Sequence, residues 1–512
     1  MNFSSLKNEK GFALVSVYLV SMVIMALSAS TYTRTFIESR EVGREINRLQ
    51  IRSAAESGIQ RALAQISFNA LTGGIAYTGF INTAPIPSTN LNNYNGTNVV
   101  GNFSVNITYP NQADWVVVNA TGTAPQGESP IILEARVFLD SNFSKYMMYA
   151  NTPNLGLGDN LLLGASDGTN PEGVPTNGTD RNMLYYTGDL TFSGSNVNIY
   201  GDTHTQGLIN GNASSWNHGD TYAGGFTTNS FGQVTNSGVS GGLRVGDGFS
   251  DDTDRNGDGT VNALDYPDYH DLTANGGGDS HKTETINPLN LNFYASQAQS
   301  IPGIDGIDVA RYGGGNPRYF KFEPSSSGNT TRIVEYSSPS YQTQTGSRDL
   351  QSKNGIVYVN GNVFVQGEIT GRVTVVSSND IYYADNIKYA GGNSYTSASN
   401  AASFMAKNKH YFLPESLEVS GILYGERATS SSTALDATYK RGNALNNYKP
   451  IYDAGASKLN GHFRQYGNIV MNGTANTSVY RFDRAFMYDA NAKYYRPPGL
   501  PVQPVLRLVR EA

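Results

Sequence analysis

The sequence predicts an α+β protein with a long N-terminal helix, a small antiparallel β head, and then a mostly β, β-helix-like solenoid with loop-rich insertions. Three observations predict it. Residues 12–66 contain no proline and keep apolar residues at helical spacing. Residues 103–140 alternate apolar and polar side chains, as half-buried strands do. From residue 141 onward, short apolar runs recur between Gly- and Asn-rich turns, which is typical of stacked short strands.

The predicted helix has an apolar first third and a charged remainder. The uncharged run from Phe12 to Ala29 covers about 18 residues, near the lower end of what crosses a bilayer as a helix. Apolar residues then continue at steps of three and four, with arginines and glutamates between them. An unbroken helix over 12–66 would be roughly 80 Å long. We expect its first third in lipid and the rest in water.

Two features of this helix carry a family resemblance. Gly11 is followed by Phe12 after a short polar leader, and residues 54–58 read Ala-Ala-Glu-Ser-Gly. With the unbroken helix, these features resemble the type IV pilin superfamily, and the second resembles PilX-type minor pilins. The resemblance covers about 55 residues. It implies a leader over 1–11, a membrane-spanning and amphipathic pilin helix over 12–68, cleavage after Gly11 by a prepilin peptidase, and N-methylation of Phe12.

One position departs from the family pattern. Most major pilins have Glu at the fifth mature residue, where this chain has Ser16. In the family that Glu is thought to neutralise the α-amine of a neighbouring subunit, and an unpaired charge in hydrocarbon is costly. The resemblance therefore implies a minor pilin or pseudopilin at or near the tip of a filament. The alternative interpretation of the same segment is an ordinary signal anchor.

Composition limits the remaining possibilities. The chain has 512 residues and no cysteine, so it holds several domains but neither disulfides nor thiolate metal sites. Its 56 glycines, 33 tyrosines and low share of charged residues indicate an extracellular β protein. The net charge of −6 gives no support for nucleic-acid binding.

Residues 69–140 are predicted to form a pilin-like β head. The Gly- and Pro-rich segment 69–100 is expected to be a connecting loop. Strands are expected over 103–109, 114–122 and 130–140, packed on the polar half of the helix. We expect Trp115 to pack in this layer, with a binding role as the alternative.

Residues 141–410 are predicted to form the solenoid. In 355–387, four short strands are expected, with Ile356, Tyr358, Val363 and Val365 among the inward residues and glycines 355, 361, 367 and 371 at the corners. Large polar insertions are expected over roughly 210–350. Residues 411–512 should add further solenoid turns and a Pro-rich tail laid against the solenoid.

One segment, 254–265 within 245–275, carries a metal-ligand pattern. Oxygen donors fall at positions 1, 3, 5, 7, 9 and 12 of a loop with Gly at position 6, as in EF-hand calcium loops. The predicted ligands of one structural calcium ion are Asp254, Asn256, Asp258, Thr260 through its carbonyl, Asn262 and Asp265.

The calcium loop has two alternative interpretations. One is an acidic surface loop without metal. The other is recruitment of a cohesin, because the spacing resembles type I dockerin loops. The sequence has one repeat where a dockerin has two, and Tyr266-Pro267 interrupts the exit helix. We therefore prefer a structural role, in which the calcium ion orders an insertion of the solenoid.

No catalytic pattern stands out, so the chain is predicted not to be an enzyme. The six histidines are scattered without zinc-ligand spacing, and no P-loop is present. The competing hypothesis is a membrane-anchored extracellular β-helix carbohydrate-active protein, in which Asp189, Asp202 and His204 would contribute.

The combined prediction is a structural minor pilin or pseudopilin-like subunit that displays a β-solenoid for adhesion or tip interactions. Its expected partners are other pilins through the helix, the prepilin peptidase, and a surface or glycan ligand. Its expected location is the inner membrane before assembly and the cell surface or an extracellular filament afterwards.

Overall fold

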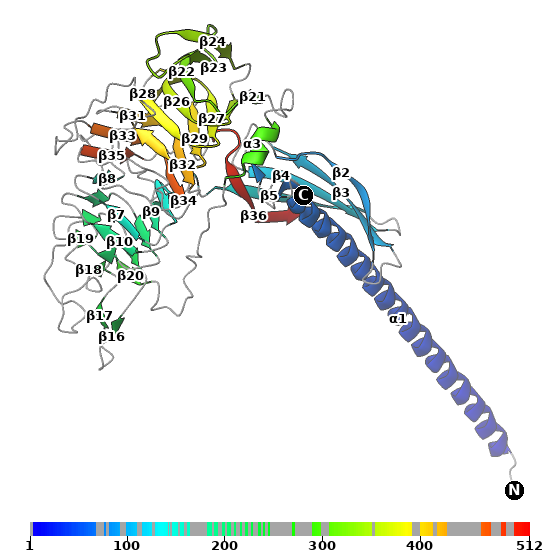
Figure 1. Ribbon diagram of the computed structural model, residues 1–512. Coiled ribbons are helices and arrows are strands. Elements are labelled where there is room, and N and C mark those ends of the chain that lie inside the picture. The colour runs from blue at the N-terminus through cyan, green and yellow to red at the C-terminus, as the bar shows by residue number, and fades with distance from the viewer. Residues whose placement is uncertain are drawn as a thin grey trace.

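The computed structural model confirms the α+β class: a long N-terminal helix is followed mostly by β-sheet (Figure 1). The structure describes residues 4–67, 76–77, 81–92, 99–109, 115–124, 129–141, 143, 146–151, 154–157, 161–163, 182–186, 189–192, 197–199, 202–205, 209–210, 216–217, 221–223, 227–228, 234–236, 239–240, 244–245, 269–271, 289–297, 307–350, 354–391, 400–412, 417–426, 462–472, 483–487 and 496–511.

Helix α1 spans Ser4–Ser67 without interruption and projects away from the β domains (Figure 1). In the described part of the chain it is the one helix long and apolar enough to cross a membrane. Its apolar window is not buried at all against the rest of the protein. Only its last turns, from Ile51 onward, pack on the head.

The head is a six-stranded antiparallel sheet. Three of the central strands match the predicted alternating runs closely, because every second side chain faces the helix and is buried. The segment expected to be a loop contributes two further edge strands. In spatial order the strands are β1 (Ala76–Tyr77), β36 (Pro501–Glu511), β5 (Ile131–Asp140), β4 (Trp115–Thr123), β3 (Val99–Thr108) and β2 (Ile86–Asn92).

The helix lies unusually close to this sheet because small residues meet at the contact. Ala55 and Gly58 face the sheet, and Gly122 of β4 faces the helix. A Cβ on Gly122 would overlap with the carbonyl oxygen of Ile51 and would lie 2.8 Å from the amide nitrogen of Ala55. A Cβ on Gly58 would lie 3.1 Å from Val105 Cγ2. The Ala-Ala-Glu-Ser-Gly phrase is therefore a packing surface, with its Ala and Gly members inward.

The C-terminal strand corrects one prediction. The tail was expected to lie against the solenoid, but Pro501–Glu511 pairs with β5 inside the head sheet. Pro504 is tolerated because β1, on the other side of its strand, pairs only with Pro501 and Val502, so that in the described residues the strand is an edge strand at Pro504. Residues 141–500 are therefore an insertion between two neighbouring head strands. The part of the tail that does contact the inserted domain is Arg496–Leu500, which is buried.

The inserted domain is built around two long sheets whose strands are mostly parallel. All neighbours in the first sheet pair in parallel. Its order is β20 (Tyr269–Asp271), β15 (Thr221–Ala223), β12 (Asp202–Thr205), β9 (Asn182–Tyr186), β6 (Met148–Ala150), β34 (Ile469–Asn472), β32 (Ile422–Glu426), β29 (Ala401–Ala406), β27 (Arg372–Ser377), β25 (Asn354–Val359) and β21 (Ile307–Tyr312).

The second long sheet is parallel except at one end, where β22, β23 and β24 form an antiparallel flap. Its order is β19 (Arg244–Val245), β14 (Trp216–Asn217), β11 (Asn198–Ile199), β8 (Leu161–Leu163), β35 (Asp483–Met487), β33 (His462–Tyr466), β31 (Leu417–Ser420), β28 (Ile381–Tyr389) with β30 (His410–Phe412) beside it, β26 (Val363–Ile369), β22 (Arg318–Pro324), β23 (Thr331–Tyr336) and β24 (Gln344–Asp349).

Successive strands alternate between these sheets, so each strand pairs with the strand one turn away along the chain. In the first half a third, four-stranded sheet is inserted into each turn. Its order is β18 (Val239–Ser240), β13 (Ile209–Asn210), β10 (Asp189–Phe192) and β7 (Asn154–Leu157), and a small hairpin pairs β16 (Thr227–Thr228) with β17 (Val234–Asn236).

The two halves of the inserted domain meet in its middle. The first strand of the N-terminal half, β6, pairs with β34 near the end of the C-terminal half, and β8 pairs likewise with β35. The chain therefore enters and leaves the domain at the same level, beside the head. Ser141 Oγ donates to the carbonyl of Pro501 at 2.8 Å, and the Arg496 guanidinium donates to the carbonyl of Leu139. These bonds tie the entering and leaving segments together.

Helix α3 (Leu291–Gln297) and the head share an aromatic joint with the inserted domain. Tyr77 of β1 stacks on Phe293, with ring centroids 3.7 Å apart. The Tyr294 hydroxyl donates to the carbonyl of Gly499 at 2.8 Å. Burial raises the pKa of Tyr294 well above its ordinary value, so this hydroxyl stays a donor. The joint holds the head against the first long sheet.

The close helix–sheet contact yields a stability prediction. Gly122→Ala should destabilise the head by at least about 3 kcal/mol, at the upper end of overpacking costs, because its methyl group meets backbone and not a movable side chain. The measurement is thermal unfolding of the full chain in detergent.

Gly43→Ala is the matched control in the exposed part of the same helix. A Cβ there meets nothing within 4 Å, and removing a helical glycine gains about 1 kcal/mol of helix propensity. Equal melting temperatures for Gly122→Ala and the unmodified protein would contradict the packing argument.

Candidate functional site

The exposed surface of α1 outside the apolar run is the first candidate site. Val42, Ile46 and Leu49 are 59%, 50% and 58% exposed, although they are large and apolar. Val42 precedes the buried Ile51 by about two and a half helical turns, which places it on the opposite side of the helix. We call Val42, Ile46 and Leu49 the outer stripe. The helix thus has one apolar face on its own head and a second one in solvent.

The predicted processing residues lie in the N-terminal turns of α1. The backbone of Gly11 and Phe12 is helical, and the side chain of Phe12 lies outside the described ones. Ser16 is half-buried, and the apolar residues from Leu14 to Leu27 around it are mostly exposed.

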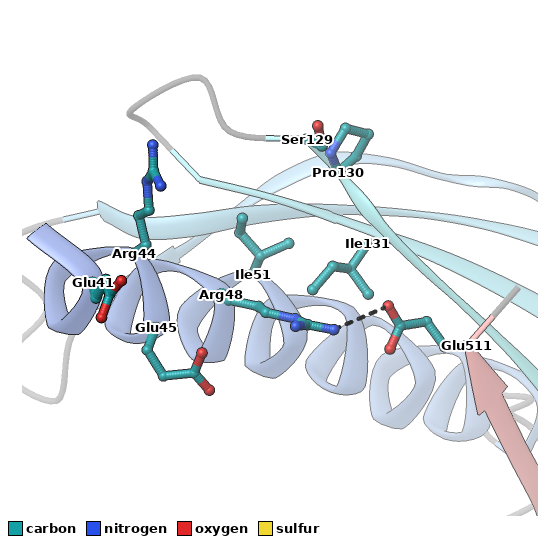
Figure 2. A pocket seen from close by; sticks show the side chains of 9 residues that line it. All are labelled: Glu41, Arg44, Glu45, Arg48, Ile51, Ser129, Pro130, Ile131 and Glu511. Carbon is teal, nitrogen blue, oxygen red and sulfur yellow. Dashed lines mark ion pairs between the residues drawn. The ribbon is translucent and has the colours of Figure 1, made fainter.

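A groove of about 780 Å³ opens where α1 leaves the head. Figure 2 shows Glu41, Arg44 and Glu45 projecting from the helix, Arg48 pointing toward Glu511, and Pro130 and Ile131 above the helix. The Arg48 guanidinium lies 4.0 Å from a carboxylate oxygen of Glu511, the last described residue of β36. Both side chains are more than half exposed, so this pair adds little stability. The groove is chiefly a charged, open surface.

The predicted calcium ligands, Asp254 to Asp265, lie outside the described residues. Among the residues that are described, no group of three or more His, Cys, Asp and Glu side chains is arranged to hold a metal ion. The described chain resumes at Tyr269, in the last strand of the first long sheet. In the sequence, the predicted calcium ligands therefore come shortly before the last strand of that sheet.

The residues of the competing enzyme hypothesis are divided between two sheets. Asp189 begins β10 in the four-stranded sheet, and Asp202 and His204 lie on β12 in the first long sheet. His204 is buried and contacts the ring of Tyr146 edge-on, with ring centroids 6.4 Å apart. Their closeness in sequence does not place the three residues on one strand.

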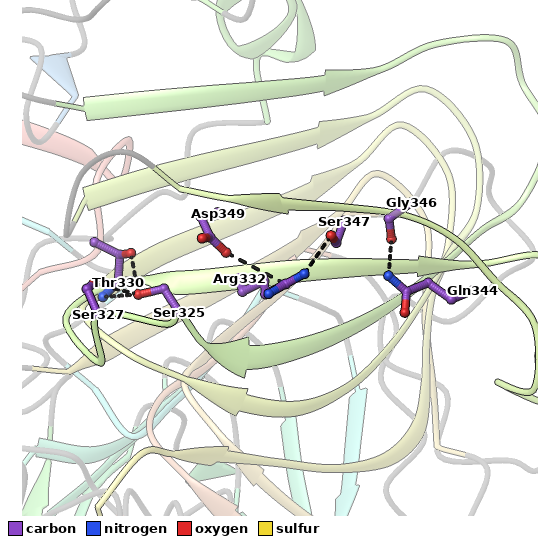
Figure 3. Close-up of polar contacts among 8 residues, drawn as sticks. All are labelled: Ser325, Ser327, Thr330, Arg332, Gln344, Gly346, Ser347 and Asp349. Carbon is purple, nitrogen blue, oxygen red and sulfur yellow. Dashed lines mark hydrogen bonds and ion pairs between the residues drawn. The ribbon is translucent and has the colours of Figure 1, made fainter.

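The free end of the C-terminal half carries a polar surface on the flap. Figure 3 shows Arg332 of β23 donating to Ser347 Oγ at 2.8 Å and facing Asp349 of β24, whose carboxylate lies 3.7 Å away. Ser325 and Thr330 close the β22–β23 turn through a 2.9 Å hydroxyl contact. Most of these contacts are between neighbouring side chains of the flap, although Arg332 Nε has no hydrogen-bond partner among the described residues. The arrangement is that of a solvated sheet face.

His410 is a buried histidine whose two ring nitrogens both have partners. Nε2 lies 2.7 Å from the carbonyl oxygen of Tyr424, and Nδ1 lies 3.0 Å from the hydroxyl of Tyr383. A carbonyl can only accept, so Nε2 carries the proton and Nδ1 accepts from Tyr383. Burial lowers the pKa of His410 to about 4, against the smaller opposing effect of the bond to Tyr424. The imidazole is therefore neutral and structural.

The outer face of the head sheet is the surface that sequence reasoning missed. Trp115 was expected to pack in the layer, but it is half-exposed on the face turned away from α1. The alternation of side chains along β4 indicates this orientation. Val116 and Val118 are buried under the helix, so the side chain of Trp115 points to the opposite face of the sheet.

Comparisons with known proteins add one finding. Neither a protein-family model nor a curated protein matches this sequence. A solved structure to which the chain is similar is the competence-associated pilin ComZ from Thermus thermophilus, at 10% identity and a TM-score of 0.31, over 91% of this chain and 97% of that one. At that TM-score the likeness carries no argument about fold or function.

The neutral His410 predicts acid sensitivity. Its pKa is about 4 in the folded protein and near 6.5 when unfolded, so between these values the unfolded chain binds a proton that the folded chain does not. Stability should therefore fall as the pH drops from 6.5 toward 4. Between pH 7 and pH 5 this group should cost about 2 kcal/mol.

The measurement compares unfolding of the unmodified protein with that of His410→Gln at pH 7, 6 and 5. The amide of Gln cannot titrate, so the variant should be less stable at pH 7 but should show a shallower dependence on pH. Parallel profiles for the two proteins would show that His410 does not contribute.

Proposed function

We propose that the chain is a minor pilin or pseudopilin-like structural subunit, without enzymatic activity, of a type IV pilus-like filament. It is cleaved after Gly11, methylated at Phe12, and assembled at or near the tip, where the inserted β domain is displayed as a solenoid for adhesion or tip interactions. Its N-terminal helix lies in the inner membrane before assembly and packs against other pilins afterwards.

The observation that carries this proposal is the two-faced helix. A plain signal anchor needs only a span that crosses lipid. The outer stripe begins 13 residues after Ala29, which is about 20 Å farther along the helix and outside the bilayer core. Large apolar side chains exposed there favour packing against another chain.

Charge on the same part of the helix favours helix partners. Among the described residues, the ion pairs of α1 are Arg34–Glu38, Arg52–Glu56 and Arg48–Glu511. Arg44 and Glu45, beside the groove, take part in none of these pairs. Apolar stripes flanked by charges of both signs are the pattern by which helices choose register and orientation in bundles.

The position at the tip rests on Ser16 and on the family resemblance. Without a carboxylate at this position, the subunit has no group to neutralise the α-amine of the subunit packed beside it. Such a subunit fits poorly inside a filament, and a large inserted domain is most easily accommodated at its end.

Processing gives the test of this proposal. Mass spectrometry of the protein purified from a filament fraction should find a first residue of N-methylated Phe12. Gly11→Val should leave the leader attached and remove the protein from the filament fraction, whereas Gly43→Ala should do neither. An intact Met1 in assembled protein, or a cut near Ala29, would overturn the proposal.

We further propose that one structural calcium ion binds at 254–265. Its support is the spacing of oxygen donors in the sequence and the place of the loop directly before β20. An ion that binds the folded loop and not the unfolded chain stabilises by mass action, by about 2.7 kcal/mol at 100 times the dissociation constant.

Excess chelator should therefore lower the melting temperature of the full chain, and added calcium should restore it. Asp254→Ala with Asp258→Ala should melt at the lower temperature with or without calcium. Asp385→Asn, at an exposed position of β28, is the control and should still respond. A melting temperature indifferent to chelator would refute the calcium proposal.

A further inference from the structure

The outer face of the head sheet carries a cationic and aromatic surface across three strands. We call it the head patch: Trp115 of β4, Glu134, Arg136 and Phe138 of β5, and Arg507 and Arg510 of β36. Trp115 lies opposite Phe138 in the ladder. Glu134 lies opposite Arg510, and their side chains pair at 2.7 Å. The patch is therefore built by strands that the head sheet holds rigidly.

Two guanidinium groups lie over two aromatic rings in this patch. The Arg136 guanidinium carbon is 5.0 Å from the centroid of the Trp115 ring. That of Arg507 is 5.2 Å from the centroid of Phe138. Such stacking holds each guanidinium in place over its ring.

Arg136 has unused bonding capacity. Its nearest carboxylate, Glu134, is 3.8 Å from Nε, beyond hydrogen-bond distance. Nε itself is shielded from solvent and has no hydrogen-bond partner among the described residues. The side chain is 41% exposed. A guanidinium that lies over a ring, in a side chain that is partly exposed, can present its outer N–H groups to a planar carboxylate with two parallel hydrogen bonds.

Charge points to the same class of ligand. The patch has three arginines against one glutamate, a net charge of +2, on a chain whose net charge is −6. Ile132, at its margin, and Leu508, opposite Arg136 in the ladder, are 40% and 44% exposed and offer apolar contacts. Next to Glu134, the side chains of Asn119 and Thr121 are half-exposed and offer donors and acceptors for hydroxyl groups.

We propose that the head patch binds an anionic polysaccharide of the uronate class. Arg136 and Arg507 hold carboxylates of the sugar units, Trp115 and Phe138 contact the apolar faces of the rings, and Glu134 and Asn119 bind hydroxyl groups. A nucleic acid fits less well, because a phosphate backbone needs a longer basic track and Glu134 would repel it. The inference rests on the adhesive part of the proposed function and adds a binding surface on the head to that of the inserted domain.

The test uses the full chain in detergent, with polygalacturonate, neutral dextran and duplex DNA as probes. The chain has two tryptophans, so binding at the patch should change the fluorescence of Trp115, and Trp115→Phe should remove that change. We expect polygalacturonate to bind and dextran not to bind. Arg136→Gln should weaken binding at least tenfold with an unchanged melting temperature, and affinity should fall with added salt.

Arg332→Gln is the matched control, because Arg332 lies on the remote flap, its side chain is exposed to a similar degree as that of Arg136, and its Nε lies 3.7 Å from Asp349 where Arg136 Nε lies 3.8 Å from Glu134. It should leave binding unchanged. Equal loss in Arg332→Gln and Arg136→Gln, equal binding of dextran, tighter binding of DNA, or no binding of polygalacturonate would each overturn the proposal. The assay requires neither cleavage nor assembly, so a cut near Ala29 and failure of sugar binding are separate outcomes.

Discussion

The contact between α1 and the head sheet determines the rest of the architecture. It depends on having no side chain at Gly122 and Gly58 and only methyl groups at Ala54 and Ala55. This close approach fixes the direction in which α1 extends away from the head sheet. The exposure of the outer stripe follows from that direction. The sheet covers one side of the helix from Ile51 onward, whereas the outer stripe lies before Ile51 and on the opposite side.

The sheet under the helix is completed only by the last strand of the chain. β36 lies between β1 and β5, and Val502 and Leu506 contribute to the core beneath the helix. The head therefore cannot close until the whole insertion has been made. The insertion in turn begins and ends beside the head. Within it, β6 pairs with β34, and Asn468, just before β34, donates to the carbonyl of Tyr146, just before β6, at 2.6 Å. Head and inserted domain are thus coupled by chain topology as well as by the aromatic joint.

Much of this fold could be predicted from periodicity, and the failures have physical causes. The strands at 103–108, 115–122 and 131–140 are confirmed because one face of each is buried. Ile86–Asn92 was missed because it is an edge strand, exposed on both faces, with no apolar alternation to detect. In β25 the inward side was assigned wrongly: Val357 and Val359 line the main core, while Ile356 and Tyr358 face the aromatic joint. Both faces of that strand are buried, so alternation had no preferred phase. The pairing of β36 with β5 is a contact between distant segments and has no local signal.

Of the individually predicted residues, the calcium ligands lie outside the described residues. The predicted corner glycines are divided: Gly361 and Gly371 have φ of 131° and 80° at turns, whereas Gly355 and Gly367 lie within strands.

The two connections between head and inserted domain also determine how load passes through the molecule. If the helix is anchored in a filament and the outer end of the β domain is held, tension reaches the head at Asp140 and Pro501. These residues stand at the same end of two antiparallel strands, next to the bond between Ser141 and Pro501. Because both connections lead into the inserted domain, tension would pull the two strands in the same direction and would pass into the sheet through the pairing of β5 with β4 and of β36 with β1. The stacking of Tyr77 on Phe293 and the bond from Tyr294 to Gly499 lie beside this point and carry part of the load.

A ligand bound to the head patch would not load the inserted domain, because β4, β5 and the helix contact one another directly within the head. Adhesion through the head would therefore leave the inserted domain free of tension.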